Sequence, residues 1–505
     1  MKPSLTLSKA GMLALTGLLL SLSSCKKDKK DDMGQSIEAV DFYLLTTSNA
    51  LIKYNGENPS MPLATTPISG IASGENIVSI DFRPATGQLY GISNMSKLFV
   101  INPDNGMAKQ VGAEPFTPAL NSTKVSIDFN PTVDRLRVIT DKGQNLRMNP
   151  ETGTVVATDG NINGVMNAAI TGAAYTNSKA GATSTVLFDI DATTQKLYKQ
   201  NPPNDGKLEE VGALKVNFSG VAAFDISPDN KVSIAALTTN SGTGLYFIDV
   251  NTGKATMVTK IAQAVIGLAI QSAPVAYATD ASNGLIIFNP MMPSYMVSKP
   301  ATGIATGDKI VGLDFRPANS QLYALGSTGR IYTVNTSNAA FTQVGNVFAT
   351  ALMGTEFGFD FNPTVDRIRL VSNMGQNLRL NPNDGTVAMV DGMLNPGTPA
   401  VTAAAYTNNF AGATTTTLFV VDAAAGKLFK QDPPNNGTLV EIGTLGGMFN
   451  GSNGFDIGGR TGMAYAVLTS GTATGIYSIN LTTGRATMMS SFGTQVSAMA
   501  VSPGL

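Results

Sequence analysis

The chain has 505 residues, 43% of them hydrophobic, so it is long enough to form two or three packed domains. Its 34 basic and 35 acidic residues nearly cancel, which excludes the basic footprint of a nucleic-acid-binding protein. It has no histidine and one cysteine, which excludes histidine-based catalytic triads, intrachain disulfides and thiolate zinc sites. Abundant glycine (52 residues) among short apolar runs is typical of an all-β protein with many turns.

Residues 1–24 have the pattern of a secretory signal peptide. Lys2 and Lys9 give a basic start, residues 12–20 form a short apolar core, and the sequence LSSC follows. This ending resembles the lipobox of bacterial lipoproteins, which implies that Cys25 is lipidated and becomes the mature N-terminus. An ordinary signal peptide with an incidental cysteine is the alternative.

Residues 25–36 are expected to be a tether, because KKDKKDD after Cys25 is charged and has no apolar content. The predicted location is therefore the bacterial cell envelope, with the lipid in a membrane, most simply the outer membrane. The sequence does not decide which face of that membrane the protein occupies.

A long motif, NPTVDRLRVITDKGQNLRMNP at 130–150, returns 232 residues later as NPTVDRIRLVSNMGQNLRLNP at 362–382. Such a near-copy indicates a tandem duplication. A shorter period lies within each half, since IDFRP at 80–84 is followed 47 residues later by IDFNP at 127–131. Four short strands for every 40–50 residues or so are the signature of a propeller blade. Turns such as NPDNG at 102–106 place proline and glycine where a tight hairpin requires them.

The ends of each half determine the predicted topology. Residues 40–54 lack a first strand, whereas VIGLAI at 265–270 and VSAMAV at 496–501 are first strands without a blade. If each completes the first blade of its own half, the chain forms two tandem five-bladed β-propellers, at 37–272 and 273–505. This all-β fold closes both rings and leaves no open edge. The alternative is a single ten-bladed ring, in which 265–270 pairs with the segment at 275–290.

The motifs DFRPATGQLYGI, FNPTVDRLR and GQNLR, with their second copies, resemble the bacterial family of the domain of unknown function 4394. The resemblance covers essentially all of 37–505 as two consecutive copies, although GSTGRIYTVN replaces SNMSKLFVIN in the second. It implies an exported propeller-like module and assigns no chemistry.

The arginines of the long motif are the main candidates for a binding site. Alternation along a strand places the first two arginines of each copy on one face, and the next strand carries Gln, Asn and a third arginine. Together these side chains could bind a carboxylate, phosphate or acidic sugar. The alternative is that they pair with Asp134, Asp128 or Asp81 and hold the blades together. The candidate residues are Arg135, Arg137, Gln144, Asn145 and Arg147, with the copies Arg367, Arg369, Gln376, Asn377 and Arg379.

Aspartates recur at one position in three of the five blades of each half, at Asp81, Asp128 and Asp225 and at Asp314, Asp360 and Asp456. Carboxylates around an axis could bind a cation or act as an acid and base pair. Repetition at one blade position favours a structural role instead, in which each carboxylate bonds to backbone amides. We therefore expect no cofactor and no dedicated metal ligand, although a calcium ion remains possible.

A second matched pair, KLYKQNPPNDG at 196–206 and KLFKQDPPNNG at 427–437, predicts a stiff exposed loop. The loop could border a ligand cleft, with Tyr198 or Phe429 as a stacking platform. The alternative is a connector whose aromatic residues belong to the core.

These features favour a lipid-anchored, non-catalytic module that binds a glycan or another envelope component. Two alternatives remain, namely a carboxylate-dependent hydrolase or lyase and a scaffold for envelope proteins. The hydrolase needs two carboxylates in one open pocket, which a sequence does not reveal.

Overall fold

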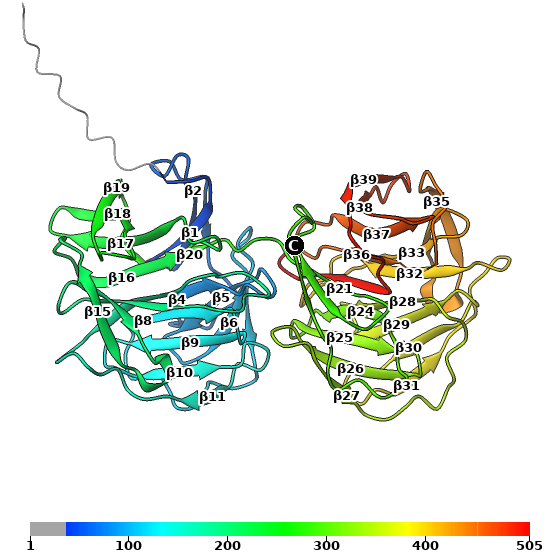
Figure 1. Cartoon of the computed structure of the whole chain (residues 1–505), viewed down its shortest axis with the longest axis horizontal. Coiled ribbons are helices and arrows are strands. Elements are labelled where there is room, and N and C mark those ends of the chain that lie inside the picture. Colours follow the sequence, from blue (N-terminus) through cyan, green and yellow to red (C-terminus); the bar gives the residue numbers. More distant parts are fainter. Residues whose placement is uncertain (1–36, 452) are drawn as a thin grey trace, which may run out of the picture.

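Each half of the chain closes on itself through its last strand. In the computed structural model, which describes residues 37–451 and 453–505, β1 (Asp41–Thr46) pairs with β20 (Val265–Ile270). In the second half β21 (Ala276–Thr279) pairs with β40 (Ala498–Val501) in the same way. The protein is therefore two tandem five-bladed propellers, which lie side by side (Figure 1). The ten-bladed alternative is wrong, because 265–270 pairs with β1 and not with the segment at 275–290.

The first propeller, ring 1, has five four-stranded antiparallel blades, written here from the axis outward. Blade 1 contains β20, β1, β2 (Ala50–Asn55) and β3 (Ala64–Pro67). Blade 2 contains β4 (Ile77–Phe82), β5 (Leu89–Ser93), β6 (Leu98–Ile101) and β7 (Ala108–Val111). Blade 3 contains β8 (Val125–Asn130), β9 (Arg135–Thr140), β10 (Asn145–Met148) and β11 (Val155–Thr158). Blade 4 contains β12 (Ile170–Tyr175), β13 (Leu187–Asp191), β14 (Lys196–Gln200) and β15 (Leu208–Ala213), with the 3-10 turn η1 (Pro203–Asp205) before the last strand. Blade 5 contains β16 (Ser219–Ile226), β17 (Ser233–Thr239), β18 (Gly242–Ile248) and β19 (Ala255–Ile261).

The second propeller, ring 2, repeats this order. Blade 1 contains β40, β21, β22 (Leu285–Phe288) and β23 (Met296–Lys299). Blade 2 contains β24 (Ile310–Arg316), β25 (Gln321–Gly326), β26 (Arg330–Asn335) and β27 (Ala340–Val344). Blade 3 contains β28 (Phe357–Asn362), β29 (Arg367–Ser372), β30 (Asn377–Leu380) and β31 (Val387–Val390). Blade 4 contains β32 (Val401–Tyr406), β33 (Leu418–Asp422), β34 (Lys427–Gln431) and β35 (Leu439–Thr444), with η2 (Pro434–Asn436) before the last strand. Blade 5 contains β36 (Gly454–Ile457), β37 (Ala464–Ser470), β38 (Ala473–Ile479) and β39 (Ala486–Ser491).

The innermost strands surround the axis of each ring in an unbroken cycle. In ring 1, β4 contacts β8, β8 contacts β12, β12 contacts β16, β16 contacts β20, and β20 returns to β4. The strands β24, β28, β32, β36 and β40 form the same cycle in ring 2. Each blade therefore has a neighbour on both faces, which explains why its inner strands are apolar on both sides.

The hydrophobic cores lie between adjacent blades. One buried cluster joins blades 2 and 3 of ring 1, for example, and contains Tyr90 and Phe129 with their rings in an edge-to-face arrangement. Clusters of this kind occupy the interface of each neighbouring pair of blades in both rings. Each cluster of buried residues belongs to a single ring, which is the arrangement expected of two separate folding units.

The predicted hairpins are present where the sequence places them. Gly106 and Gly385, the last residues of two NPxxG turns, have φ angles of 75° and 69°, which glycine adopts without steric cost. The predicted signal peptide at 1–24, Cys25 and the tether at 25–36 lie outside the described residues. Within the part of the chain that the structure describes, no helix has the length and apolar character needed to cross a membrane.

Candidate functional site

A cavity of about 220 Å³ opens between blades 3 and 4 of ring 2 and brings together three arginines of the long motif. Arg367 and Arg369 come from β29, and Arg379 comes from β30, directly opposite Arg369. The aromatic ring of Tyr406 at the end of β32 and the 3-10 turn η2 complete the wall. The residues that line the cavity are Asn362, Val365, Arg367, Arg369, Arg379, Tyr406, Pro434 and Asn435.

The central guanidinium, that of Arg369, is 2% exposed and held on all sides. Its Nη1 donates to Asn377 Oδ1 and Asp391 Oδ2, both at 2.7 Å, and its Nη2 donates to Asn435 Oδ1 at 2.8 Å. Its Nε donates to the Tyr406 hydroxyl at 3.4 Å. A buried cation needs a counter-charge and filled hydrogen bonds, and Asp391 with these partners supplies both.

Arg379 shares the same carboxylate. Its Nε and Nη2 donate to the two oxygens of Asp391 at 2.8 and 2.9 Å, the bidentate geometry in which an arginine binds a carboxylate most strongly. These two bonds raise the pKa of Arg379. Its side chain is still 31% exposed, so one edge of the guanidinium faces the cavity and the solvent.

Arg367 is the one of the three that is not paired with an acid. Its Nη1 donates to the backbone carbonyl of Asp366 at 2.9 Å, and this is the only hydrogen bond of its guanidinium to the described residues. The Asp366 carboxylate is bound to Arg316 instead. The lining of the cavity thus includes three cationic side chains and no acid, and only two of the three share the carboxylate of Asp391.

Ring 1 carries the same residue types at all eight positions, namely Asn130, Val133, Arg135, Arg137, Arg147, Tyr175, Pro203 and Asn204. The contacts are also repeated. Arg137 donates to Asn145, Asp159 and Asn204 at 2.7, 2.6 and 2.8 Å, and Arg147 binds both oxygens of Asp159. The first guanidinium, that of Arg135, again bonds only to a backbone carbonyl among the described residues. The duplication has therefore preserved these residues and their hydrogen bonds.

The predicted site residues divide into three groups. In ring 2 the three arginines of the motif line one cavity, and in ring 1 Arg137 and Arg147 share the carboxylate of Asp159. Asn145 and Asn377 lie behind them, where their Oδ1 atoms accept from Arg137 and Arg369. The glutamines do not line the cavity: Gln376 Nε2 donates to Ala351 O at 2.9 Å and its Oε1 accepts from Met353 N. Gln144 fixes the equivalent loop of ring 1.

The structural partners proposed for these arginines are also corrected. The acid that binds Arg137 and Arg147 is Asp159, and neither Asp81 nor Asp128 nor Asp134 does so. The shared dipeptide Asp-Gly at 159–160 and 391–392 was a usable signal in the sequence. The proline-rich loops do border the cavity, but through Pro434 and Asn435. Tyr198 is buried and Phe429 half-buried in the core, so neither forms a platform.

The repeated aspartates hold adjacent blades together. Asp81 accepts from Phe82 N and, across the blade boundary, from Phe129 N, both at 2.7 Å. Asp128 bonds in the same way to Tyr175 N of the next blade, and ring 2 repeats these contacts. The structural interpretation of the aspartates is therefore correct, with the addition that they bridge blades as well as turns.

These carboxyl groups are fully buried and lie close together. Oxygens of Asp81, Asp128 and Asp225 lie within 4.8 Å of one another, as do those of Asp314, Asp360 and Asp456. Burial raises the pKa of each, and the neighbouring carboxylates raise several of them further. The pKa of Asp225 and the pKa of Asp456 are raised to about 7, again by burial.

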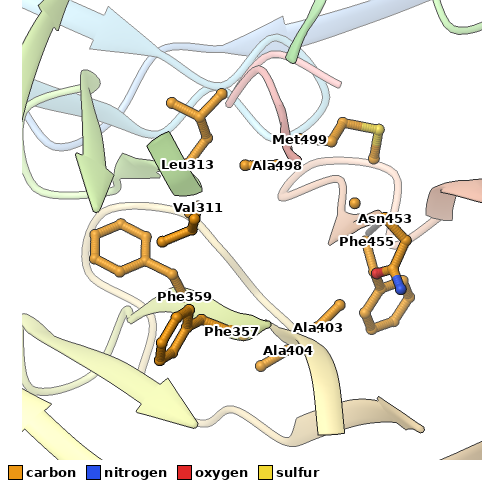
Figure 2. A pocket seen from close by; sticks show the side chains of 13 residues that line it. Val311, Leu313, Phe357, Phe359, Ala403, Ala404, Asn453, Phe455, Ala498 and Met499 are labelled. Carbon is orange, nitrogen blue, oxygen red and sulfur yellow. The ribbon is translucent and has the colours of Figure 1, made fainter. Parts of the chain in front are cut away.

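A small cavity lies among the innermost strands of ring 2. It has a volume of about 10 Å³ and is lined by apolar side chains such as Leu313 and Phe359 together with Asn453, but not by the aspartates (Figure 2). That volume is about enough for one water molecule. It does not admit a sugar ring, so this cavity does not supply the open pocket that a carboxylate-dependent hydrolase needs.

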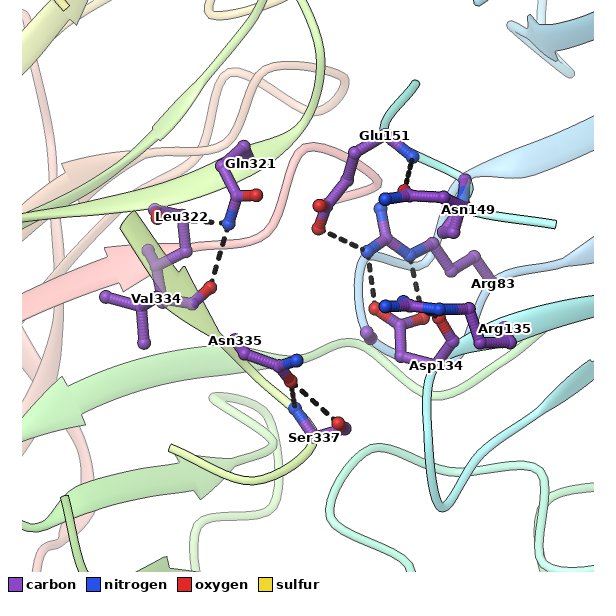
Figure 3. Close-up of polar contacts among 12 residues, drawn as sticks. Arg83, Asp134, Arg135, Asn149, Glu151, Gln321, Leu322, Val334, Asn335 and Ser337 are labelled. Carbon is purple, nitrogen blue, oxygen red and sulfur yellow. Dashed lines mark hydrogen bonds and ion pairs between the residues drawn. The ribbon is translucent and has the colours of Figure 1, made fainter. Parts of the chain in front are cut away.

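A further arginine cluster lies where the two rings meet. Arg83 binds Asp134 and Glu151 in ring 1 and faces the segment from Asn335 to Ser337 of ring 2 (Figure 3). The hydroxyl of Tyr277 in ring 2 donates to Ala85 O at 2.9 Å, beside this cluster. Arg83 is 1% exposed. Its copy Arg316 is more open, with 12% of its side chain exposed.

Comparison with known proteins identifies the family. The model of the family described as "Domain of unknown function (DUF4394)" matches residues 50–269 and again 284–501. The two matches cover most of the chain, which belongs to this family as a tandem pair. No curated protein matches the sequence.

Proposed function

We propose that this DUF4394-family protein is a non-catalytic binding module of the bacterial cell envelope that recognises an acidic glycan or a similar anionic component. The observation that carries the proposal is the cavity between blades 3 and 4 of ring 2, which three arginines line and where two of them share one carboxylate, that of Asp391. An anion entering there would meet the guanidinium of Arg367, which is paired with no acid among the described residues.

The roles of the lining residues follow from their contacts. Arg367 and the exposed edge of Arg379 are the groups that would bind a carboxylate or sulfate, since planar guanidiniums match these anions. Arg369 is buried and already donates four hydrogen bonds, two of which hold Asp391 and Asn435 in position. Tyr406 and Pro434 add apolar surface of the kind that packs against a sugar ring.

The repetition of all eight residues in ring 1 supports bivalent binding. Two weak sites on one chain raise the apparent affinity for a polymer, because the second contact forms within the same complex. Neighbouring charge makes the two sites unequal. Burial raises the pKa of Glu151, and the Arg83 guanidinium acts against that rise. Arg135 also lies close enough to Glu151 to act in the lowering direction. Ring 2 has Asn383 at that position, and its site should be the stronger.

Attachment to the envelope is the second part of the proposal. It rests on the sequence of residues 1–36, in which the only cysteine follows LSS and precedes a charged stretch. Replacing Cys25 with Ala should abolish labelling by a radioactive fatty acid and release the protein from the membrane fraction. Unchanged labelling and fractionation of the C25A variant would overturn this part of the proposal.

The test of binding uses a soluble form, residues 33–505, which keeps every residue that the structure describes. It is applied to an array of carboxylated, sulfated and neutral glycans, at low salt and again at about 0.5 M salt. We expect hits confined to acidic glycans and weakened by salt, because the ions screen exposed charges. Binding to neutral glycans alone, or to none, would contradict the proposal and favour a protein scaffold.

A further inference from the structure

Asp189 breaks the repeat between the two rings. It stands in β13 of ring 1, whereas β33 of ring 2 has Val420 at the same place. Its side chain has no exposed surface, and neither carboxylate oxygen has a hydrogen-bond partner among the described residues. Buried polar groups are almost always paired, so an unpaired buried carboxylate indicates a water molecule, an ion or a bound proton.

The register of the strands shows where this side chain points. Asp189 lies directly opposite Ala173, so both side chains are on the same face of blade 4. Ala173 and Tyr175 pack against Ile139 of blade 3, which identifies that face as the one turned to blade 3. Asp128 reaches across the same boundary to accept from Tyr175 N at 3.1 Å. Asp189 therefore points toward Asp128, one of the axial aspartates, and toward Arg137, which lies opposite Asp128 on the same face of blade 3. Burial raises the pKa of Asp189, and the Arg137 guanidinium acts in the other direction.

The spacing of the axial aspartates fits a calcium-sized ion. Oxygens of Asp81, Asp128 and Asp225 lie within 4.8 Å of one another, and Ca²⁺ holds its oxygen ligands at about 2.3–2.6 Å. Ligands on opposite sides of one ion are thus about 5 Å apart. The bonds from backbone amides do not prevent coordination, because each carboxylate oxygen has a second lone pair.

We propose that the axis of ring 1 binds a divalent cation of the calcium class, with Asp81, Asp128 and Asp225 as ligands and Asp189 as an acceptor for water on the ion. A purely oxygen donor set selects hard cations of this kind. A water-sized cavity of about 10 Å³ lies on the same axis and is lined in part by Ser79 and Ser126, but not by the aspartates. Ring 2 has Gly312 and Gly358 at these two positions and Val420 in place of Asp189, so its three aspartates should bind the ion more weakly.

The duplication supplies matched variants for the test. D189V gives ring 1 the residue that ring 2 packs at the same place, so it should fold, and V420D makes the reverse change. Ca²⁺ is titrated by calorimetry into the chelator-stripped form 33–505 of the wild type and each variant. Melting is also followed in Ca²⁺ and in EDTA.

We expect the wild type to bind Ca²⁺ and to melt at a higher temperature in its presence, and D189V to bind at least tenfold more weakly. V420D should gain affinity in ring 2. A wild type that binds no Ca²⁺ and melts identically in EDTA would overturn the proposal. A D189V variant that binds as tightly as the wild type would also overturn it. A higher melting temperature of D189V without any effect of Ca²⁺ would identify Asp189 as a protonated buried acid.

Discussion

Asp225 accepts a hydrogen bond from the backbone amide of Ile270 at 2.6 Å and thereby ties blade 5 of ring 1 to its closing strand. Its other oxygen accepts from Ile226 N, also at 2.6 Å. Asp456 and Val501 make the equivalent contact in ring 2 at 2.7 Å. One side chain therefore spans the boundary at which the two ends of each ring meet.

Replacing Asp225 with Ala should destabilise the closure of ring 1. The variant leaves the amides of Ile226 and Ile270 without their acceptor, and each buried amide left unpaired costs about 1–3 kcal/mol. The equivalent position in blade 4 is Ala174, so the smaller side chain fits. Calorimetric melting of D225A at pH 5 should show ring 1 unfolding at a lower temperature while ring 2 is unchanged. The matched variant D456A should reverse the pattern, and equal melting of both variants and the wild type would contradict this role.

The two rings should fold independently, because each buried hydrophobic cluster belongs to one ring. Residues 37–272 expressed alone should give a soluble monomer with a single cooperative melt. That fragment loses the contacts between the rings, among them the hydrogen bonds from Tyr277 to Ala85 and from Gly504 to Thr86 and the ion pair of Arg460 with Asp104. An aggregated or non-cooperative fragment would show that ring 1 depends on ring 2.

Stability in EDTA should fall as the pH rises from about 4 to about 7. Asp225 and Asp456 have pKa values raised from 3.8 to about 7 by burial, so the folded state binds more protons than the unfolded state over this range. The neighbours of Asp456 are the carboxyl groups of Asp314 and Asp360, which cannot offset its charge. Stabilisation by its proton is thus complete below pH 4 and lost as the pH passes 7.

Urea unfolding at pH 5 and at pH 8 measures this difference. The aspartates with lowered pKa values, such as Asp41 and Asp280, lose their stabilising charge only below about pH 4 and do not interfere. D456A, compared with the wild type, should show a smaller loss of stability between the two values of pH. Greater stability of the wild type at pH 8 than at pH 5 would refute the assignment.

The ion pair of Arg83 in ring 1 and its copy at Arg316 in ring 2 should contribute unequally to the free energy of unfolding. R83A leaves Asp134 and Glu151 in a site where Asp134 is 8% exposed, and a buried charge left unpaired costs about 3–5 kcal/mol. R316A leaves Asp366, which is 36% exposed and hydrated, so its loss should be at most about 1 kcal/mol. Urea unfolding of both variants tests the ranking, and equal losses would mean that ring 2 does not shield Arg83.

The sequence predicted correctly those features that depend on the residues of a single strand or hairpin. The strand VIGLAI at 265–270 had no partners in its own neighbourhood, which led to the prediction of ring closure that β20 and β1 confirm. The alternation in RLR at 135–137 likewise placed the arginines on one face. Both inferences use patterns within short segments, namely the order of strands in a blade and the alternation of side chains along a strand.

Contacts between distant segments could not be read in this way. Arg137 is bound by Asp159 and by Asn204, which lies 67 residues away in a loop of another blade. Arg83 and Arg316 have nearly identical local sequences, yet only Arg83 is covered by the other ring. The packing of blades and rings against one another determines these environments. It leaves no regular spacing of residues that can be recognised in a single sequence.

Binding through Arg367 is the central claim, and calorimetric titration of an acidic oligosaccharide such as oligogalacturonate tests it most directly. The proteins compared are the wild type, R135A, R367A, the double variant and R485A, which removes an exposed arginine on an outer turn of another blade. We predict that R367A weakens binding at least tenfold, R135A less, and the double variant most, while R485A binds like the wild type. All should melt within a few degrees of it, because Arg135 and Arg367 each bond only to a backbone carbonyl among the described residues. Wild-type affinity in the double variant would contradict the claim.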